Sequence, residues 1–79
     1  MFPYTKAQLK AKQKQALERL VKVAGGRTHL ARMLGKPLPT INSWINRGMI
    51  SEEGANLASN HDAFNGEFPV EYLRPDLEV

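Results

Sequence analysis

The stretch Arg27–Gly48, RTHLARMLGKPLPTINSWINRG, decides the fold, because two short helical patterns meet in it. The first pattern has three apolar residues at helical spacing, Leu30, Ala31 and Leu34. The second pattern repeats that spacing with Ile41, Trp44 and Ile45. Gly35 follows the first pattern and Gly48 the second, and glycine readily takes the left-handed conformation that ends a helix. The stretch therefore predicts two helices joined by a tight turn.

The bounds of these two helices follow from their caps and prolines. The first helix should run from its N-cap Thr28 to Leu34, and the second from about Leu38 to Asn46 or Arg47. Pro39 fits inside the second helix, because N–H groups in a first turn have no partner within the helix anyway. Helix, turn and helix over residues 28–47 is the outline of a helix-turn-helix, whose second helix normally enters the major groove of DNA.

Before this stretch, residues 5–24 predict a basic amphipathic helix that Thr5 caps and Gly25-Gly26 ends. Its apolar stripe consists of Leu17, Leu20, Val21 and Ala24. Its first half instead carries lysines four residues apart on one face, Lys6, Lys10 and Lys14. Like charges at this spacing repel one another. Two interpretations stay open, namely a solvated, fraying helix end and a lysine stripe that lies near phosphates.

After this stretch, residues 49–79 predict an acidic supporting half. We expect a helix from its N-cap Ser51 to about Asn60, in which Gly54 costs roughly 1 kcal/mol relative to alanine. Its packing must therefore be tight, or the helix weak. We expect a loop rather than a hairpin around Asn65-Gly66, with Phe64 and Phe68 plugging the core. A short helical turn, Val70 to Leu73, should follow and stop at Pro75.

The chain has 79 residues and no cysteine, which predicts one domain over 1–79 and excludes disulfides and thiolate catalysis. A chain this short buries a small core, so a second copy would add stability. No apolar run approaches the roughly 20 residues that span a bilayer. We expect a soluble, cytoplasmic protein.

The net charge of +3 hides a division between the two halves of the chain. Residues 1–48 carry ten Lys or Arg and one acid, giving +9, and residues 49–79 carry one Arg and seven acids, giving −6. A polyanion is attracted to the first half and repelled by the second, which favours a nucleic-acid partner. The alternative is that the two halves attract each other within the fold.

The run GGRTHLARMLGKPLPTINSWINRG, followed by EYLRPDL, resembles the small Cro-like phage and prophage repressors, in particular the YdaS-type antitoxin-like subgroup. The resemblance covers roughly Ala16 to Leu77. It implies an all-α, lambda-repressor-like or Cro-like helix-turn-helix domain of about five helices. It also implies binding to a double-stranded DNA operator, usually as a homodimer, and a regulatory role in a phage or prophage.

The sequence departs from this family in three places. Lys36 stands where an apolar residue usually follows the turn glycine, so Leu38 is expected to fill that space. Leu38 and Pro39 occupy early positions of the recognition helix that are often polar. The basic extension before Gln15 is longer than the family core needs.

The candidate site is the outward face of the second helix and the basic residues around it. Candidates for reading bases are Leu38, Pro39, Thr40, Asn42 and Ser43. Candidates for binding phosphates are Arg27, Thr28, His29, Lys36, Asn46, Arg47, Lys10 and Lys14. Asn42 is the first choice, because a side-chain amide pairs bidentately with adenine. Trp44 is expected in the core rather than stacked on a ligand.

Other functions have less support. The sequence shows no nucleophile with an orienting base and no phosphate-binding glycine loop, so we expect no enzyme, no catalytic residue and no cofactor. Two histidines without cysteine predict no metal site. One alternative is an antitoxin-like module that binds a protein partner through its acidic half, with Phe64, Phe68, Tyr72 and Leu77 forming a patch. RNA binding is disfavoured, because no aromatic strand platform is visible.

Overall fold

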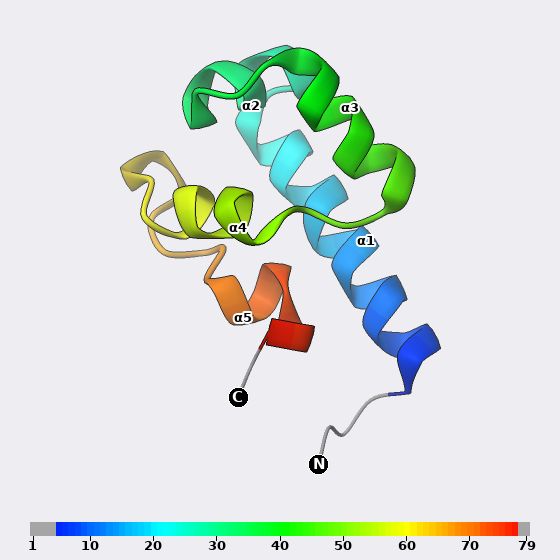
Figure 1. The fold of residues 1–79 in the computed structure, drawn as a ribbon. Coiled ribbons are helices and arrows are strands. Elements are labelled where there is room, and N and C mark those ends of the chain that lie inside the picture. Colours follow the sequence, from blue (N-terminus) through cyan, green and yellow to red (C-terminus); the bar gives the residue numbers. More distant parts are fainter. Residues whose placement is uncertain (1–4, 78–79) are drawn as a thin grey trace.

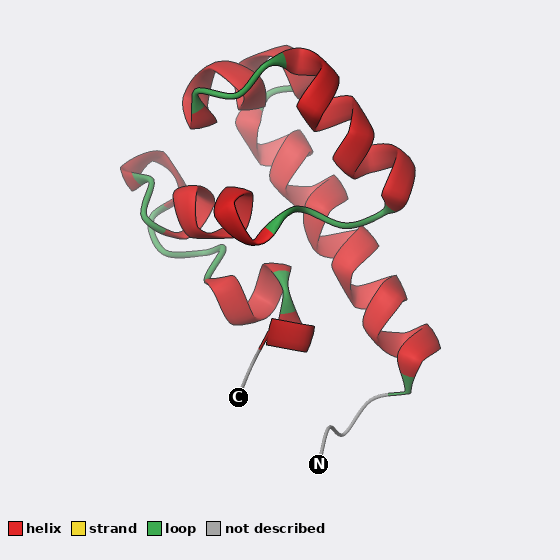
Figure 2. Ribbon diagram, viewed as in Figure 1, coloured by secondary structure: helices red, strands yellow, loops and turns green. Residues whose placement is uncertain are grey.

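The computed structural model describes residues 5–77, which form five α-helices around one core (Figure 1). The helices are α1 (Lys6–Ala24), α2 (Arg27–Leu34), α3 (Leu38–Arg47), α4 (Glu52–Ser59) and α5 (Val70–Leu73). Short 3₁₀ turns span Asp62–Phe64 and Pro75–Leu77. The described residues contain no strand (Figure 2). The predicted all-α class with about five helices is confirmed.

Helix α1 is the longest element; α2, α3 and α5 pack against it, and α4 packs against α2 and α5 (Figure 1). Thr5 caps it as expected, and a capping box forms with Gln8: the Gln8 N–H donates to the Thr5 hydroxyl at 3.2 Å, and the Thr5 N–H donates to the Gln8 side chain at 2.9 Å. Gly25 ends α1 in the left-handed conformation, with φ 94°. In residues 5–77 no helix is both long enough and apolar enough to cross a membrane.

The start of α2 differs from the expectation. The helix begins at Arg27 with Gly26 as its N-cap, so Thr28 lies inside the first turn and does not cap it. The reason is the glycine pair, because Gly25 at φ 94° and Gly26 at φ 121° reverse the chain within two residues. The Leu30 N–H then already bonds to the Gly26 carbonyl at 3.0 Å.

The core lies where all five helices meet, and it contains most of the apolar residues that the sequence pattern predicted; Val21, Ala24 and Ile45 are only partly buried against it. Phe64 and Phe68 are 1% and 0% exposed and plug the core from the loop between α4 and α5, as expected. The loop holds a 3₁₀ turn and a left-handed Asn65, not a hairpin. The buried apolar residues are Ala16, Leu17, Leu20, Leu30, Ala31, Leu34, Ile41, Trp44, Ile50, Ala55, Ala58, Phe64, Phe68 and Leu73.

Gly54 in α4 resolves the question that the sequence left open, because it is buried against Trp44 of α3. A Cβ atom on Gly54 would lie 2.8 Å from Cζ2 of Trp44 and 2.9 Å from Cγ1 of Ile50, and closer still to Cη2 of the indole. Real side chains do not approach so closely. The packing is therefore tight, and only glycine lets α4 approach the indole at this point.

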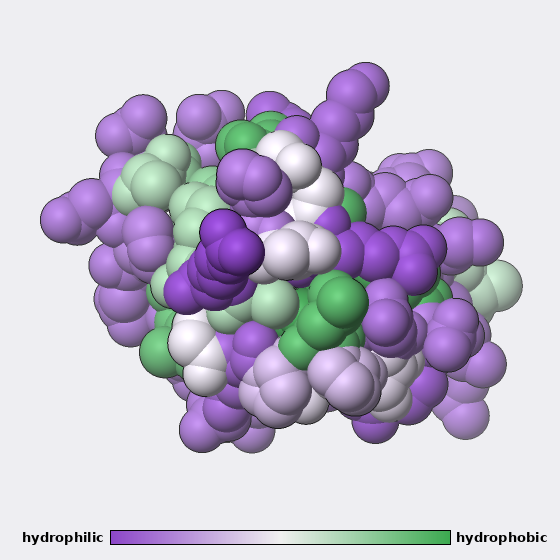
Figure 3. Space-filling view, turned by 90° about the horizontal axis from the view of Figure 1, so that it is seen from above, coloured by the Kyte–Doolittle hydropathy of each residue, from purple (hydrophilic) through white to green (hydrophobic). Residues whose placement is uncertain are grey.

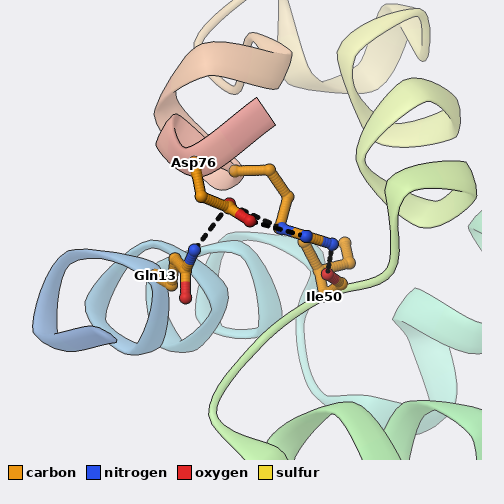
Figure 4. Close-up of polar contacts among 4 residues, drawn as sticks. Gln13, Ile50 and Asp76 are labelled. Atoms are coloured by element: carbon orange, nitrogen blue, oxygen red, sulfur yellow. Dashed lines mark hydrogen bonds and ion pairs between the residues drawn. The ribbon is translucent and has the colours of Figure 1, made fainter. Parts of the chain in front are cut away.

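The end of the chain is fastened by a polar cluster that the sequence reasoning missed (Figure 4). The Arg74 guanidinium binds both carboxylate oxygens of Asp76 at 2.9 and 2.8 Å and donates to the Ile50 carbonyl at 2.9 Å. The Gln13 side chain in α1 donates to Asp76 at 2.6 Å. Gln13 is 5% exposed and has its hydrogen bond inside the fold. This Arg74 clasp ties the segment after α5 to α1 and to the segment that links α3 with α4.

We expect Gly54→Ala to lower the free energy of unfolding by about 1–3 kcal/mol, because overpacking against Trp44 outweighs the roughly 1 kcal/mol that alanine gains in a helix. Urea denaturation measures the change. Asn56→Ala in the same helix is the matched control, since Asn56 is exposed and gains only helix propensity. A Gly54→Ala variant as stable as Asn56→Ala would contradict the tight packing.

The clasp also predicts a dependence of stability on pH. The hydrogen-bonded Arg74 guanidinium holds the pKa of the Asp76 carboxyl below its ordinary value. The ionised carboxylate therefore stabilises the fold above its unfolded-state pKa of about 3.9, and this contribution disappears as the pH falls through the lower, folded-state pKa.

Asp76→Asn should accordingly reduce stability at neutral pH by about 1 kcal/mol, the typical worth of a hydrogen bond. The difference from the unsubstituted chain should shrink as the pH falls below about 4 and through the lowered pKa of Asp76. Urea unfolding across this range tests it, with Asp62→Asn as the control that removes an exposed carboxylate from the same half. If the difference in unfolding free energy between Asp76→Asn and the unsubstituted chain stays constant down to the lowest pH, the ionised carboxylate does not stabilise the fold.

Candidate functional site

Helices α2 and α3 form the predicted helix-turn-helix. Gly35 ends α2 in the left-handed conformation with φ 66°, and Pro37 precedes α3 as its N-cap. Pro39 lies in the first turn of α3, where the sequence placed it. Helix α3 ends at Arg47, before a left-handed Gly48 with φ 71°. Both predicted helix ends at glycine are confirmed.

Trp44 anchors α3 to the core and so determines which face remains outside. Trp44 is 2% exposed and Ile41 is fully buried, while Ile45 is partly buried against the core. Trp44 is therefore a core residue, as expected. With this face turned inward, the opposite face of α3 carries its polar side chains toward solvent.

The five candidate base readers all lie on α3 but do not share one face, because Thr40 is one turn from the buried Trp44 and Leu38 is two turns from the partly buried Ile45. Leu38, Pro39 and Ser43 are exposed, and Thr40 and Asn42 are half-buried. The expectation that Leu38 fills the space beside Lys36 is wrong, because Leu38 is 39% exposed. Seen from the end that carries α2 and α3, the surface is mostly hydrophilic with apolar patches between the polar side chains (Figure 3).

Lys36 itself explains why no apolar residue is needed after the turn glycine. Its ammonium group forms an ion pair with Glu53 in α4, and its side chain is 23% exposed. The pair links the turn of the helix-turn-helix to the next helix. From the sequence, Lys36 was expected to bind a DNA phosphate. In the structure its ammonium group is instead paired with the carboxylate of Glu53.

Arg27 and Asn42 were assigned separately to phosphate and base contacts, and the structure brings them together. Arg27 is the first residue of α2, and its Nη1 donates to Oδ1 of Asn42 in the middle of α3 at 3.0 Å. Sequence spacing alone could not pair two residues on different helices. This contact bridges the two helices on their outer side.

The lysine stripe of α1 meets the end of α3 at a basic pocket. The pocket has a volume of about 230 Å³ and is lined by Lys10, Gln13, Lys14, Arg47, Gly48 and Met49. Three of the predicted phosphate ligands therefore share one site, although they come from two helices. Sequence reasoning missed Gln13 and Met49; the position of Gln13, three residues after Lys10, was the available signal.

The remaining phosphate candidates lie at the two ends of the helix-turn-helix. Thr28 and His29 are exposed in the first turn of α2, and Asn46 is exposed near the end of α3. Backbone N–H groups in a first turn have no helical partner and favour anions. None of these three residues lines the basic pocket.

The two oppositely charged halves do contact each other, as the alternative to a nucleic-acid partner supposed. Arg19 lies 3.6 Å from Glu67, and its guanidinium lies 5.5 Å from the ring centre of Phe68. Lys36 and Glu53 form the second contact of this kind. Exposed ion pairs contribute little to stability. These contacts do not involve the residues that line the basic pocket.

The aromatic patch required by the protein-interaction alternative does not form in the described residues. Phe64 and Phe68 are buried, Leu77 is half-buried, and Tyr72 is 36% exposed. The Tyr72 hydroxyl also accepts a hydrogen bond from Nη1 of Arg19 at 3.5 Å, and the centre of its tilted ring lies 5.9 Å from that of Phe68. These residues support the fold. Glu78, one of the acids of this half, lies outside the described residues.

One known protein is similar to the chain over most of its length. It is described as "Putative transcriptional regulator YdaS" from Escherichia coli (strain K12), and it is 31% identical over 67 residues, which cover 85% of this chain and 67% of the relative. The chain belongs to the family of this regulator. No family model matches the sequence, and no solved structure matches it. The YdaS-like assignment agrees with the resemblance read from the residues, at the level of a regulator family.

Proposed function

We propose that this YdaS-like protein is a sequence-specific DNA-binding regulator of transcription, of phage or prophage type, that acts as a homodimer. The observation that carries the proposal is the orientation of α3. Trp44 and Ile41 are buried, so Asn42 and Ser43 lie on the opposite side of a helix that belongs to a helix-turn-helix. Membership in a family with a regulator supports the same function and argues against an enzyme.

In the proposed complex α3 lies in the major groove. Asn42 pairs with a base edge, Ser43 adds a second hydrogen bond, and Leu38, Pro39 and the Thr40 methyl contact thymine methyl groups. The amide contact discriminates best, because it can satisfy two groups of one base at once. The apolar contacts at the start of the helix add a weaker preference.

Contacts to the phosphate backbone of the DNA set the register of α3 on the duplex. Lys10, Lys14 and Arg47 surround the basic pocket and bind phosphate there. Thr28, His29 and Asn46 bind phosphates at either end of the helix-turn-helix. The charge division of +9 against −6 draws the polyanion toward the first half of the chain. Lys36 contributes less, because Glu53 neutralises it.

Capture of genomic fragments on the immobilised protein, with sequencing at two salt concentrations, tests this function. A DNA-binding regulator enriches a short set of related sequences, and the enrichment falls steeply at the higher salt concentration. Retention of fragments without any shared sequence would reject the specific function. Retention of none would reject DNA binding altogether.

Asn42→Ala should flatten the preference at one base pair of the enriched sequence. Loss of a bidentate contact lowers discrimination there by about 1–3 kcal/mol, or roughly 5- to 150-fold, with a smaller change in affinity for unrelated DNA. Titration of duplexes that carry each base at that position measures the effect. Asn46→Ala removes a proposed phosphate ligand from the same helix and is the matched control, which should lower affinity without changing the base preference. An unchanged base preference would show that Asn42 does not recognise a base.

Lys10→Ala combined with Lys14→Ala should reduce the slope of log K against log salt by about 2, because each phosphate contact releases roughly 0.9 of a counterion. The base preference should stay the same. The charge-preserving pair Lys10→Arg and Lys14→Arg is the control and should keep the slope. An unaltered slope in the alanine variant would show that these lysines do not contact phosphates.

A further inference from the structure

We infer that Arg27 is a positioning residue for Asn42, so that base preference depends on Arg27 although it need not touch a base. The inference rests on the proposed DNA-binding function and deepens it. It replaces the assignment of Arg27 to a phosphate. Its basis is the 3.0 Å hydrogen bond from Nη1 of Arg27 to Oδ1 of Asn42, which joins the first residue of α2 to the outer side of α3.

The chemistry of the two groups decides how the Asn42 amide lies. A guanidinium has only donors, whereas a carboxamide has an oxygen that accepts and an NH₂ group that donates. Turning the amide over would place two donor groups against each other and lose the bond. Arg27 therefore holds the oxygen toward α2 and leaves the NH₂ group of Asn42 as the end that is free to donate.

A fixed amide reads a base more selectively than one that rotates. The free NH₂ group donates to an acceptor on a base edge in the major groove, such as N7 of a purine. The amide oxygen has a second lone pair, which remains available for the N6 amino group of adenine. Without Arg27, the amide can rotate and offer either end, so one position accepts several bases.

The backbone geometry favours this role over a purely electrostatic one. Gly26 fixes the start of α2 directly before Arg27, and Gly35 fixes the turn into α3. Arg27 is exposed and Asn42 is half-buried. The long Arg27 side chain therefore reaches across to the shorter Asn42 side chain, which its partial burial restricts. The planar guanidinium offers several directed donors, which suits holding one acceptor in a set orientation.

The test is a double-mutant cycle read as base preference. Arg27→Ala, Asn42→Ala and the combined variant are each used to select duplexes from a randomised pool, and the unsubstituted protein defines the preferred site. Discrimination at the Asn42-dependent base pair should fall by roughly two- to tenfold in Arg27→Ala, the range of one ordinary hydrogen bond. The combined variant should match Asn42→Ala at that base pair, because a positioning residue has no effect once its partner is absent.

Arg32→Ala is the control, since it removes an equal charge from an exposed position in the same helix. It should lower affinity for all sequences alike. If Arg27→Ala behaves as Arg32→Ala, with a smaller salt slope and an unchanged base preference, Arg27 is a phosphate ligand and the inference is wrong.

A second measurement separates this inference from the proposed function. The side-chain NH₂ signals of Asn42 in the DNA-free protein should shift in Arg27→Ala and stay in place in Arg32→Ala. Unmoved Asn42 signals in Arg27→Ala would overturn the inference even if the protein binds its site. Failure of the unsubstituted protein to select any sequence would instead overturn the proposed function, and the inference with it.

Discussion

The contact between Trp44 and Gly54 is the constraint on which the rest of the structure depends. The indole fills the space that a Cβ atom on Gly54 would occupy, and this fixes α4 against α3. Once Trp44 is buried at 2% exposure, the rotation of α3 about its own axis is set. The side of α3 that carries Ser43 must then face outward, because a helix cannot turn one face inward without exposing the opposite one. Packing of the core thus determines which side chains of α3 are available to contact bases in the proposed site.

The Arg74 clasp extends the same constraint to the end of the chain. Arg74 holds the Ile50 carbonyl in the segment that follows α3, and Asp76 accepts from Gln13 in α1. Helix α1 and the segment after α5 are therefore joined beside the segment that links α3 to α4 (Figure 4). The terminal Leu-Arg-Pro-Asp run, which contributed to the family resemblance, has a structural explanation: Leu73 is buried and Arg74 binds Asp76.

Most helices could be predicted from the sequence, because apolar periodicity and glycine stops are local signals. The bounds of α3 and α4 and the burial of Trp44 followed from them. The start of α2 did not, since Thr28 and Gly26 are both reasonable caps and only the reversal at the glycine pair decides between them. The ion pair of Lys36 was also missed, because its partner Glu53 comes from another helix.

The candidate site divides in the same way, and the division bears on the proposed recognition helix, α3. The start of α3 is apolar at Leu38 and Pro39, and the nearby Lys36 is paired with Glu53, so in the proposed complex little positive charge remains there to bind DNA. The positive charge instead gathers at the other end of α3, where Arg47 meets the lysines of α1 around the basic pocket. A helix held by phosphates mainly at its end would be free to pivot at its start. The hydrogen bond between Arg27 and Asn42 restrains the amide between these ends, which is where directed base recognition needs a fixed side chain most.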